Sequence, residues 1–291
     1  MDDESALLAA IAAHPDEDTP RLAYADWLDE HGFPIRAEFI RVQIEIKKYD
    51  HLPSSQQQGH AALYRRQDAI LTQHRRELLG PLGDEFTTAE WNHDIVFDRG
   101  FLTELTLDAQ QFLNHADTIA AMKPLPDVAV YVELGWHMPA SFLRDPHIEL
   151  VRALHMVSHV LDLSEIAFNQ NPRFDRKWSR LRTLNLEGCG IGDLALRGIA
   201  ESPRYPVLTD LDLSGNEISD DGVRLLTESP LWPRLKKLVL GRNPISDIAA
   251  QTLAGAAGTS QLDYLDLRWT AIGPGGHPVL LPKYGGRVVL F

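Results

Sequence analysis

The feature that most constrains the fold is a motif that returns at one fixed spacing in the C-terminal third of the chain. Its aligned copies begin at Leu181, Leu208, Leu235 and Leu262, so each step is 27 residues. Each copy reads Leu-x-x-Leu-x-Leu-x-x-Asn-x-Ile, except that Cys189 and Thr270 replace the asparagine in the first and last copies. One such unit supplies only one apolar face. Successive copies must therefore stack to form a shared core.

This motif and its period resemble leucine-rich repeats, and the repeat length resembles the ribonuclease-inhibitor type. The resemblance implies an α/β solenoid with a parallel concave sheet and convex helices. Short convex helices are also indicated by apolar residues at two positions three apart, namely Leu196, Val223 and Ala250, followed by Ile199, Leu226, Leu253 and Leu280. The side chain at the Asn/Cys position is expected to bond the backbone of the turn, so Cys189 is interpreted as structural rather than reactive.

Earlier copies are irregular. The sequence Leu102–Phe112 fits the motif well, Leu125–Val130 fits in part, and Leu161-Asp-Leu163 with Ile166 and Phe168 fits loosely. We expect degenerate repeats over residues 102–180, with boundaries between 113 and 180 left open, and regular repeats from residue 181. Because a stacked core must be closed at both ends, residues 91–97 are predicted to form a capping strand and residues 286–291 a C-terminal cap.

The N-terminal part is predicted to be all α-helical. Caps and apolar spacing predict helices over residues 4–13, 19–31, 34–49 and 59–79. In the second helix, Thr19 and Pro20 have the form of an N-cap and first position, Gly32 suits the end, and Leu22, Ala25 and Leu28 form the face expected to be buried. We expect a small helical domain over residues 1–82 and the repeat domain over residues 83–291.

The run LLAAIAAHPDEDTPRLAYADWLDEHG…RAEFIRVQ, within residues 5–48, strongly resembles the N-terminal module of a large bacterial paralogous family, the repeat-companion domain. The segment FDRGFLTEL at residues 97–105 is similar to the joint by which such proteins enter their repeats. The resemblance implies a domain architecture and supplies no catalytic residue.

Composition excludes several classes of function. A formal net charge of −13 argues against general nucleic-acid binding, which needs Lys and Arg to displace counterions. No apolar run approaches the roughly 20 residues of a membrane-spanning helix, and the acidic N-terminal segment does not resemble a signal peptide. One cysteine permits no intrachain disulfide. We therefore expect a cytoplasmic protein that binds neither nucleic acid nor membranes.

The sequence indicates no cofactor, metal or catalytic site. Its 12 histidines are scattered, and none of the motifs HExxH, CxxC, Walker or GxSxG occurs. Tyr24 and Asp26 could in principle do acid/base chemistry, but no nucleophile lies near them in the sequence. Packing and capping of a helix explain that stretch more simply, so we expect no enzyme.

The residues between the strand leucines should form columns on the concave face. One column is predicted to hold Thr106, Asp162, Asn185, Asp212, Val239 and Asp266. The neighbouring column is predicted to hold Glu104, Val160, Thr183, Asp210, Lys237 and Tyr264. Arg268 and Trp269 follow the last strand, and Tyr, Trp and Arg are the side chains that most often dominate binding energy at interfaces.

These columns predict a non-enzymatic scaffold or adaptor that binds another protein. Whether the partner binds through a basic segment is left open, and so is the oligomeric state of the chain. The expected partner-binding residues are Asp210, Asp212, Lys237, Tyr264, Asp266, Arg268 and Trp269. One alternative is a regulator of a partner enzyme, resembling GTPase-activating proteins of the leucine-rich-repeat kind, which would present Arg242 or Asn243 at a rim. Another alternative is an enzyme with a pocket around Tyr24 and Asp26.

Overall fold

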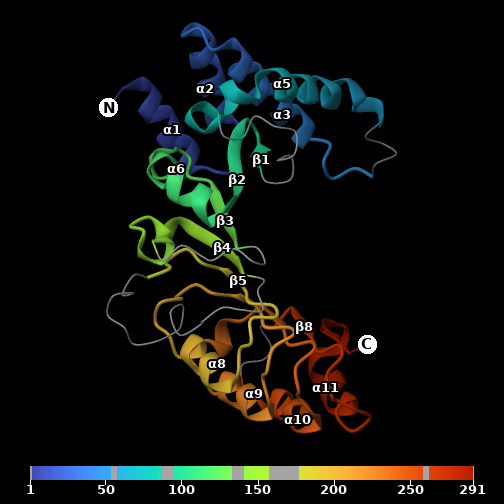
Figure 1. Cartoon of the computed structure of the whole chain (residues 1–291). Coiled ribbons are helices and arrows are strands. Elements are labelled where there is room, and N and C mark those ends of the chain that lie inside the picture. Colours follow the sequence, from blue (N-terminus) through green and yellow to red (C-terminus); the bar gives the residue numbers. More distant parts are fainter. Residues whose placement is uncertain are drawn as a thin grey trace. The chain divides into compact units, whose positions relative to one another are not determined.

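The computed structural model describes residues 2–53, 58–84, 86, 95–132, 141–156, 177–257 and 262–290. They form two compact units (Figure 1). The first comprises residues 1–106 and 115–127, and the second comprises residues 107–114 and 128–291. The first unit is mainly helical, and the second contains a parallel sheet with helices.

The first unit contains the four helices expected from the sequence, with small differences at their ends. They are α1 (Asp3–Ala13), α2 (Thr19–Glu30), α3 (Pro34–Lys47) and α5 (Ala61–Leu79). One apolar cluster joins the first three helices through Ile11, Leu28 and Ile40. Burial of these side chains supplies most of the driving force for the fold of this unit. On α5, Arg66 makes a two-pronged ion pair with Glu38 of α3.

The buried face of α2 differs from the prediction. Ala25 and Leu28 are buried, but Leu22 is 38% exposed, so its expected burial is wrong. The buried stripe instead runs through Arg21, Tyr24, Ala25 and Leu28, which are spaced as one helix face. Arg21 can be buried because its guanidinium donates to the Glu17 carbonyl and lies 5.9 Å from the Phe101 ring centroid. An arginine stem covers apolar surface well, which hydrophobicity alone does not reveal.

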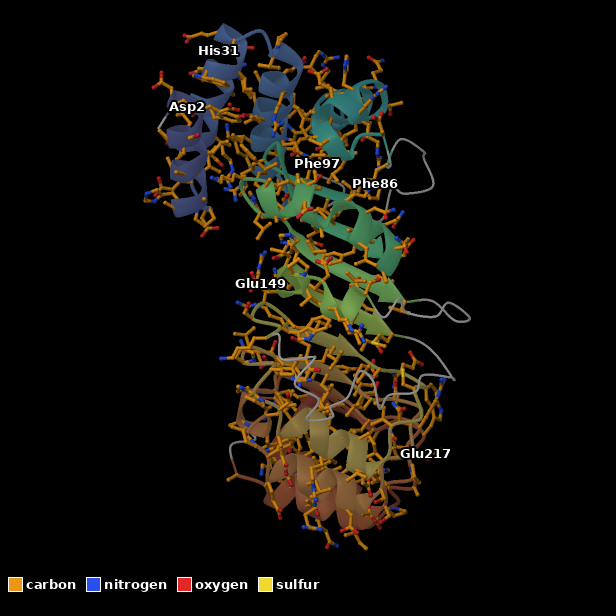
Figure 2. The ribbon with its side chains drawn as sticks, turned by 60° about the vertical axis from the view of Figure 1, so that its left-hand side comes forward. Asp2, His31, Phe86, Phe97, Glu149 and Glu217 are labelled. Atoms are coloured by element: carbon orange, nitrogen blue, oxygen red, sulfur yellow. The ribbon has the colours of Figure 1, made fainter. Side chains whose placement is uncertain are left out.

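A β-hairpin packs on these helices. Strand β1 (Ile95–Asp98) pairs antiparallel with β2 (Phe101–Asp108). Phe97, which is labelled in Figure 2, lies on β1. Its ring meets that of Phe39 on α3 edge-on, with 5.3 Å between the ring centroids. The tip of the hairpin is fixed by Gly100, whose N–H donates to Gln43 and whose φ is +84°. A Cβ on Gly100 would overlap Ile40, so only glycine fits this contact. Residues 91–94 of the predicted capping strand lie outside the described residues.

The hairpin also explains why the compact units do not divide after residue 82. Arg99 donates to the carbonyls of Pro15 and Asp16, and Phe101 joins the core of the helices, so the segment 95–106 packs with the first unit. Helix α6 (Ala109–Ala121) is shared, with residues 115–121 in the first unit.

In the second unit the strands follow one another in chain order and pair in parallel. They are β3 (Asp127–Val132), β4 (Val151–Met156), β5 (Thr183–Asn185), β6 (Asp210–Asp212), β7 (Lys237–Val239), β8 (Tyr264–Asp266) and β9 (Val288–Val289). The helices are α8 (Asp193–Ala200), α9 (Asp220–Thr227), α10 (Asp247–Gly255) and α11 (His277–Tyr284). Figure 1 shows α8, α9 and α10 side by side along the sheet. This mixed α/β architecture is compatible with leucine-rich repeats.

The 27-residue register is confirmed. Leu184, Leu211, Leu238 and Leu265 pair directly across β5 to β8, and each is at most 2% exposed. The two rows of apolar helix residues are buried as well, including Leu196, Val223 and Ala250. Strand β9, within the predicted C-terminal cap, pairs with β8.

The expected hydrogen bonds from the side chain at the Asn/Cys position to the backbone of the turn are also confirmed. Asn216 is 6% exposed; its Nδ2 donates to the carbonyls of Leu186 and Leu213, and its Oδ1 accepts from the N–H of Ile191. Cys189, at the same position one repeat earlier, is buried and donates from Sγ to the Met156 carbonyl at 3.2 Å. The turn thus gains partners for backbone groups that its strands leave unpaired.

One strand assignment is wrong. The neighbour of β5 is β4, in which Ala153 pairs with Thr183 and His155 pairs with Asn185. The predicted occupants of those positions, Val160 and Asp162, lie outside the described residues with the rest of the Leu161–Phe168 segment. Strand β4 carries the motif as Val151, Leu154 and Met156, with two apolar residues replacing leucine.

Candidate functional site

The turns that follow β5 to β8 share one unusual backbone conformation. Their equivalent residues have left-handed φ values of 65°, 67°, 56° and 55° at Gly188, Gly215, Arg242 and Trp269 respectively. The conformation is held in place because each turn donates to the next: the N–H groups of Gly188, Gly215 and Arg242 each lie 2.9 Å from a carbonyl of the following repeat. Glycine accepts this conformation without strain, whereas other L-residues lose about 1–2 kcal/mol.

At this left-handed position, the turns after β7 and β8 therefore carry large side chains, whereas the turns after β5 and β6 carry glycine. The Arg242 guanidinium carbon lies 4.5 Å from the centroid of the Trp269 ring, and that of Arg268 lies 5.3 Å from it. Trp269 is nonetheless 64% exposed. Two cations thus flank an indole that remains available to a partner, an arrangement that favours cation–π contacts.

Beside this pair, Asp266 is held by its own neighbours. Arg268 Nε lies 3.0 and 2.9 Å from the two carboxylate oxygens, the Arg268 N–H donates to Oδ1 at 3.0 Å, and the Tyr264 hydroxyl donates to Oδ2 at 3.2 Å. Burial raises the pKa of Asp266, but the hydrogen bonds and charge of Arg268 outweigh it, so the pKa lies below its usual value. Burial and the Asp266 charge raise the pKa of Tyr264, so its hydroxyl stays protonated.

The same strand-end position serves a structural purpose in three repeats. Asn185, Asp212 and Asp266 each accept a hydrogen bond at Oδ1 from the backbone N–H two residues later, at 2.9 to 3.0 Å. This is the Asx-turn geometry that short polar side chains favour. Much of the acidic column expected from the sequence therefore shapes its own turns, and Asp266, at 3% exposure, is not a surface acid.

Together these groups line a cavity of about 330 Å³ on the sheet. Its wall is formed by Glu187, Asp212, Ser214, Lys237, Val239, Gly241, Arg242, Tyr264, Asp266, Arg268 and Trp269. Lys237 lies 5.7 Å from the centroid of the Tyr264 ring, and Arg242 lies 3.9 Å from the Glu187 carboxylate. Three cations and three carboxylates face one another, so the cavity is polar and charged without a large excess of either sign.

Six of the seven predicted partner-binding residues line this cavity. They are Asp212, Lys237, Tyr264, Asp266, Arg268 and Trp269. Asp210 does not line the cavity. It lies on β6, two residues before Asp212, and accepts a hydrogen bond from the Thr209 hydroxyl. The prediction of partner-binding residues missed Glu187 and Ser214, and it named Arg242 only for the regulator alternative. The signal for them was present: they occupy the two turn positions after each strand, which repeat every 27 residues like the strand positions do.

The alternative sites fare less well. Asn243 is 4% exposed and is engaged by the turn, so of the two rim candidates only Arg242 is accessible. Tyr24 is 3% exposed and donates to Glu4, and burial raises its pKa to about 12. Asp26 is exposed and pairs with Arg41 at 2.7 Å, so Tyr24 and Asp26 do not form one site.

Metal binding gains no support from the described residues, in which no three His, Cys, Asp or Glu side chains could hold one ion. No helix in the described ranges is long and apolar enough to cross a membrane.

Comparison with known proteins supports the repeat assignment. Residues 180–200 and 206–226 match the family model described as Leucine Rich repeat. The matched segments contain β5 with α8, and β6 with most of α9. A comparison with curated proteins gives no match. The two matched segments support a leucine-rich-repeat protein. Leucine-rich repeats are commonly modules of protein interaction, which supports binding rather than catalysis as the general class of function.

Proposed function

We propose that this chain is a non-enzymatic scaffold or adaptor that binds a protein partner in the concave cavity at the C-terminal end of its repeats. The observation that carries the proposal is the stacked pair Arg242 and Trp269, held in left-handed turns beside a charged cavity. Residues kept in costly backbone conformations cluster at functional sites, where the surrounding structure holds them in place.

The proposal includes a whole architecture. The repeats form a ribonuclease-inhibitor-like solenoid over residues 83–291, capped near 91–97 and at 286–291. The helices of residues 1–82 form a repeat-companion module of bacterial type. The single cysteine, which is buried, favours a reducing compartment, and we place the protein in the cytoplasm.

The partner is proposed to carry a basic segment. Of the cavity carboxylates, Asp266 is already matched by Arg268, and Glu187 has only a long contact with Arg242. Asp212 accepts only from Ser214, and neither Asp212 nor Asp210 forms an ion pair within the described residues. These two aspartates supply the charge that would attract a basic side chain, while Trp269 and Tyr264 supply apolar contact area.

The test begins with a partner captured by the full chain and then measures its affinity for purified variants. The double variant Tyr264→Ala with Trp269→Ala should bind more weakly by over about 2 kcal/mol, as aromatic interface anchors do. A matched control is Leu194→Ala with Ile248→Ala, which removes two exposed apolar side chains from α8 and α10. The control should bind like the wild type, and equal binding by the aromatic variant would place the site elsewhere.

Charge is tested separately. Asp210→Asn with Asp212→Asn should slow association and reduce its dependence on salt, because these charges attract the partner from a distance. Association rates at two salt concentrations measure this effect.

A second candidate function is supported by one observation. Arg242 has a side chain that is 57% exposed at the cavity, as an arginine supplied to a partner's active site would need. In that case a GTPase partner would hydrolyse GTP faster with the wild-type chain than with Arg242→Ala, while still binding both. Loss of binding without a change in hydrolysis favours the scaffold.

A further inference from the structure

The first unit contains a second cavity, separate from the one on the repeats. It has a volume of about 450 Å³ and lies among α1, α2, α3, the end of α5, the start of β2 and residues 118–124. Cavities of roughly 300–1,000 Å³ are typical of small-molecule sites. The proposed scaffold function makes no use of it.

Most of its wall is apolar. Leu8, Leu78, Leu79, Phe101, Leu102 and Met122 line it. Four of these side chains belong to the buried core of the unit and are at most 6% exposed, namely Leu78, Leu79, Phe101 and Leu102. The wall is therefore rigid. An apolar ligand body that displaces water from it lowers the free energy of the system, which favours binding.

One end of the cavity is polar. Tyr24 donates to Glu4 at 2.9 Å, and because burial raises the pKa of Tyr24 to about 12, its hydroxyl remains a donor at neutral pH. The Glu4 carboxylate is thus already engaged. Arg36, in the first turn of α3, lines the same end, and its guanidinium carbon lies 6.0 Å from the centroid of the Phe101 ring.

Arg36 lacks a counter-charge. It forms no ion pair or hydrogen bond within the part of the chain that the structure describes, and its Nε is buried without an acceptor. A partly buried guanidinium without an anion is costly, and such groups call for an explanation. Lys123 adds a second cation to the wall against the one acid, Glu4, so the cavity favours an anion.

We propose that this cavity binds a small apolar monocarboxylate, with the carboxylate on the outer nitrogens of Arg36 and the hydrocarbon body against the leucines and Met122. A guanidinium matches a carboxylate with two parallel hydrogen bonds, which a hydroxyl or an amine cannot reproduce. The apolar wall favours a hydrocarbon chain over a polar metabolite.

The test uses octanoate as the probe, with octan-1-ol and octylamine as ligands of the same chain but different head groups. Titration calorimetry on the full chain should show one octanoate bound, with the neutral and cationic ligands at least tenfold weaker. Arg36→Gln should weaken octanoate at least tenfold and leave octanol unchanged. Arg41→Gln is the matched control, because Arg41 lies on the same helix but pairs with Asp26 and Asp29 outside the cavity.

Two further variants keep the result decisive. Met122→Trp places a larger side chain in the wall of the cavity and should abolish binding of both octanoate and octanol. Arg242→Ala should leave octanoate binding unchanged, which separates this site from the proposed scaffold function. Circular dichroism checks that each variant is folded; if Arg36→Gln is not, Arg36→Lys takes its place and should weaken octanoate through loss of the planar fork. No binding of octanoate, or equal binding by Arg36→Gln and Arg41→Gln, would overturn the proposal.

Discussion

The turns after β5 and β6 and the turns after β7 and β8 share a backbone and differ in what they place on it. Gly188 and Gly215 occupy the left-handed position in the first pair, and Arg242 and Trp269 occupy it in the second. The hydrogen-bond ladder runs through both pairs at the same 2.9 Å spacing. The repeat therefore does not require a large residue at the left-handed position. Arg242 and Trp269 occupy it at one end, although glycine would adopt the same backbone without strain.

The difference shows how one fold separates stability from binding. Where the turn carries no side chain, glycine adopts the left-handed conformation without strain. Where the turn carries a large side chain, the repeat tolerates the strain, because the hydrogen bonds between repeats and the buried asparagines hold the backbone. The cavity lies beside the strained turns, with Arg242 and Trp269 in its wall.

The largest expected effect is on the asparagine that supports the strained turn. Asn243 donates to the carbonyls of Leu213 and Leu240 and accepts from the N–H of Ile218, all while buried. Asn243→Ala would leave these backbone groups without partners, each at a cost of about 1–3 kcal/mol. We expect the free energy of unfolding to fall by about 3 kcal/mol or more, measured by urea denaturation.

Thr270 provides the matched comparison, because it occupies the equivalent position in the last repeat. Its hydroxyl donates to the Leu267 carbonyl at 2.8 Å and accepts a long hydrogen bond from the Ile272 N–H at 3.5 Å. Thr270→Val removes the short bond and the long one and keeps the shape, so it should cost only about 1 kcal/mol. Equal losses for the two variants would contradict the view that the backbone hydrogen bonds of the buried asparagine stabilise the turn more than the threonine hydroxyl does.

Much of the fold could be predicted from the sequence, because a strict 27-residue period fixes both register and burial. Where the period fails, the prediction fails with it. Strand β4 was missed because Val151 and Met156 occupy leucine positions of the motif. Leu161 and Leu163, further along the chain, were assigned to the motif instead because they are leucines. The face of α2 was misplaced because the Arg21 guanidinium lies over the Phe101 ring, a contact between segments far apart in the sequence.

The candidate site could be predicted only in part. Strand positions gave four of its residues, since side chains in a strand alternate in a known way. Of the turn residues, only Arg268 and Trp269 after the last strand were included, because the left-handed conformation that places Arg242 beside Trp269 depends on hydrogen bonds between repeats. Nor could the sequence predict that Asp266 is buried beneath Arg268, because that depends on rotamers.

The next effect concerns Asp266, which differs from Asp212 in having an arginine. Asp266→Asn retains an oxygen for the Arg268 N–H but loses the charge-assisted bonds to the guanidinium, and should cost about 1.5 kcal/mol at pH 7. The pKa of Asp266 is lowered in the folded chain, so its stabilisation is complete above the unfolded pKa, near 3.9, and is lost as pH falls through the lower folded value.

The difference in unfolding free energy between wild type and Asp266→Asn should therefore be constant from about pH 7 to 5 and shrink below about pH 4. Asp212→Asn is the control: it keeps the bond from Ser214 and should change stability by less than about 0.5 kcal/mol. A difference for Asp266→Asn that grows on acidification would contradict the ion pair.

The smallest effect tests the comparison most directly. Arg242→Gly and Arg242→Ala both remove the guanidinium from Trp269, but only glycine also relieves the left-handed backbone. Arg242→Gly should therefore be more stable than Arg242→Ala by about 1 kcal/mol, and both should bind the partner less well. Gly215→Ala should lose a similar amount relative to wild type, through conformation rather than collision, because a Cβ there meets no atom closer than 3.6 Å. If glycine at position 242 is no more stable than alanine, the turn is not strained. The two pairs of turns then differ only in side chains, and the departure from glycine no longer marks the site.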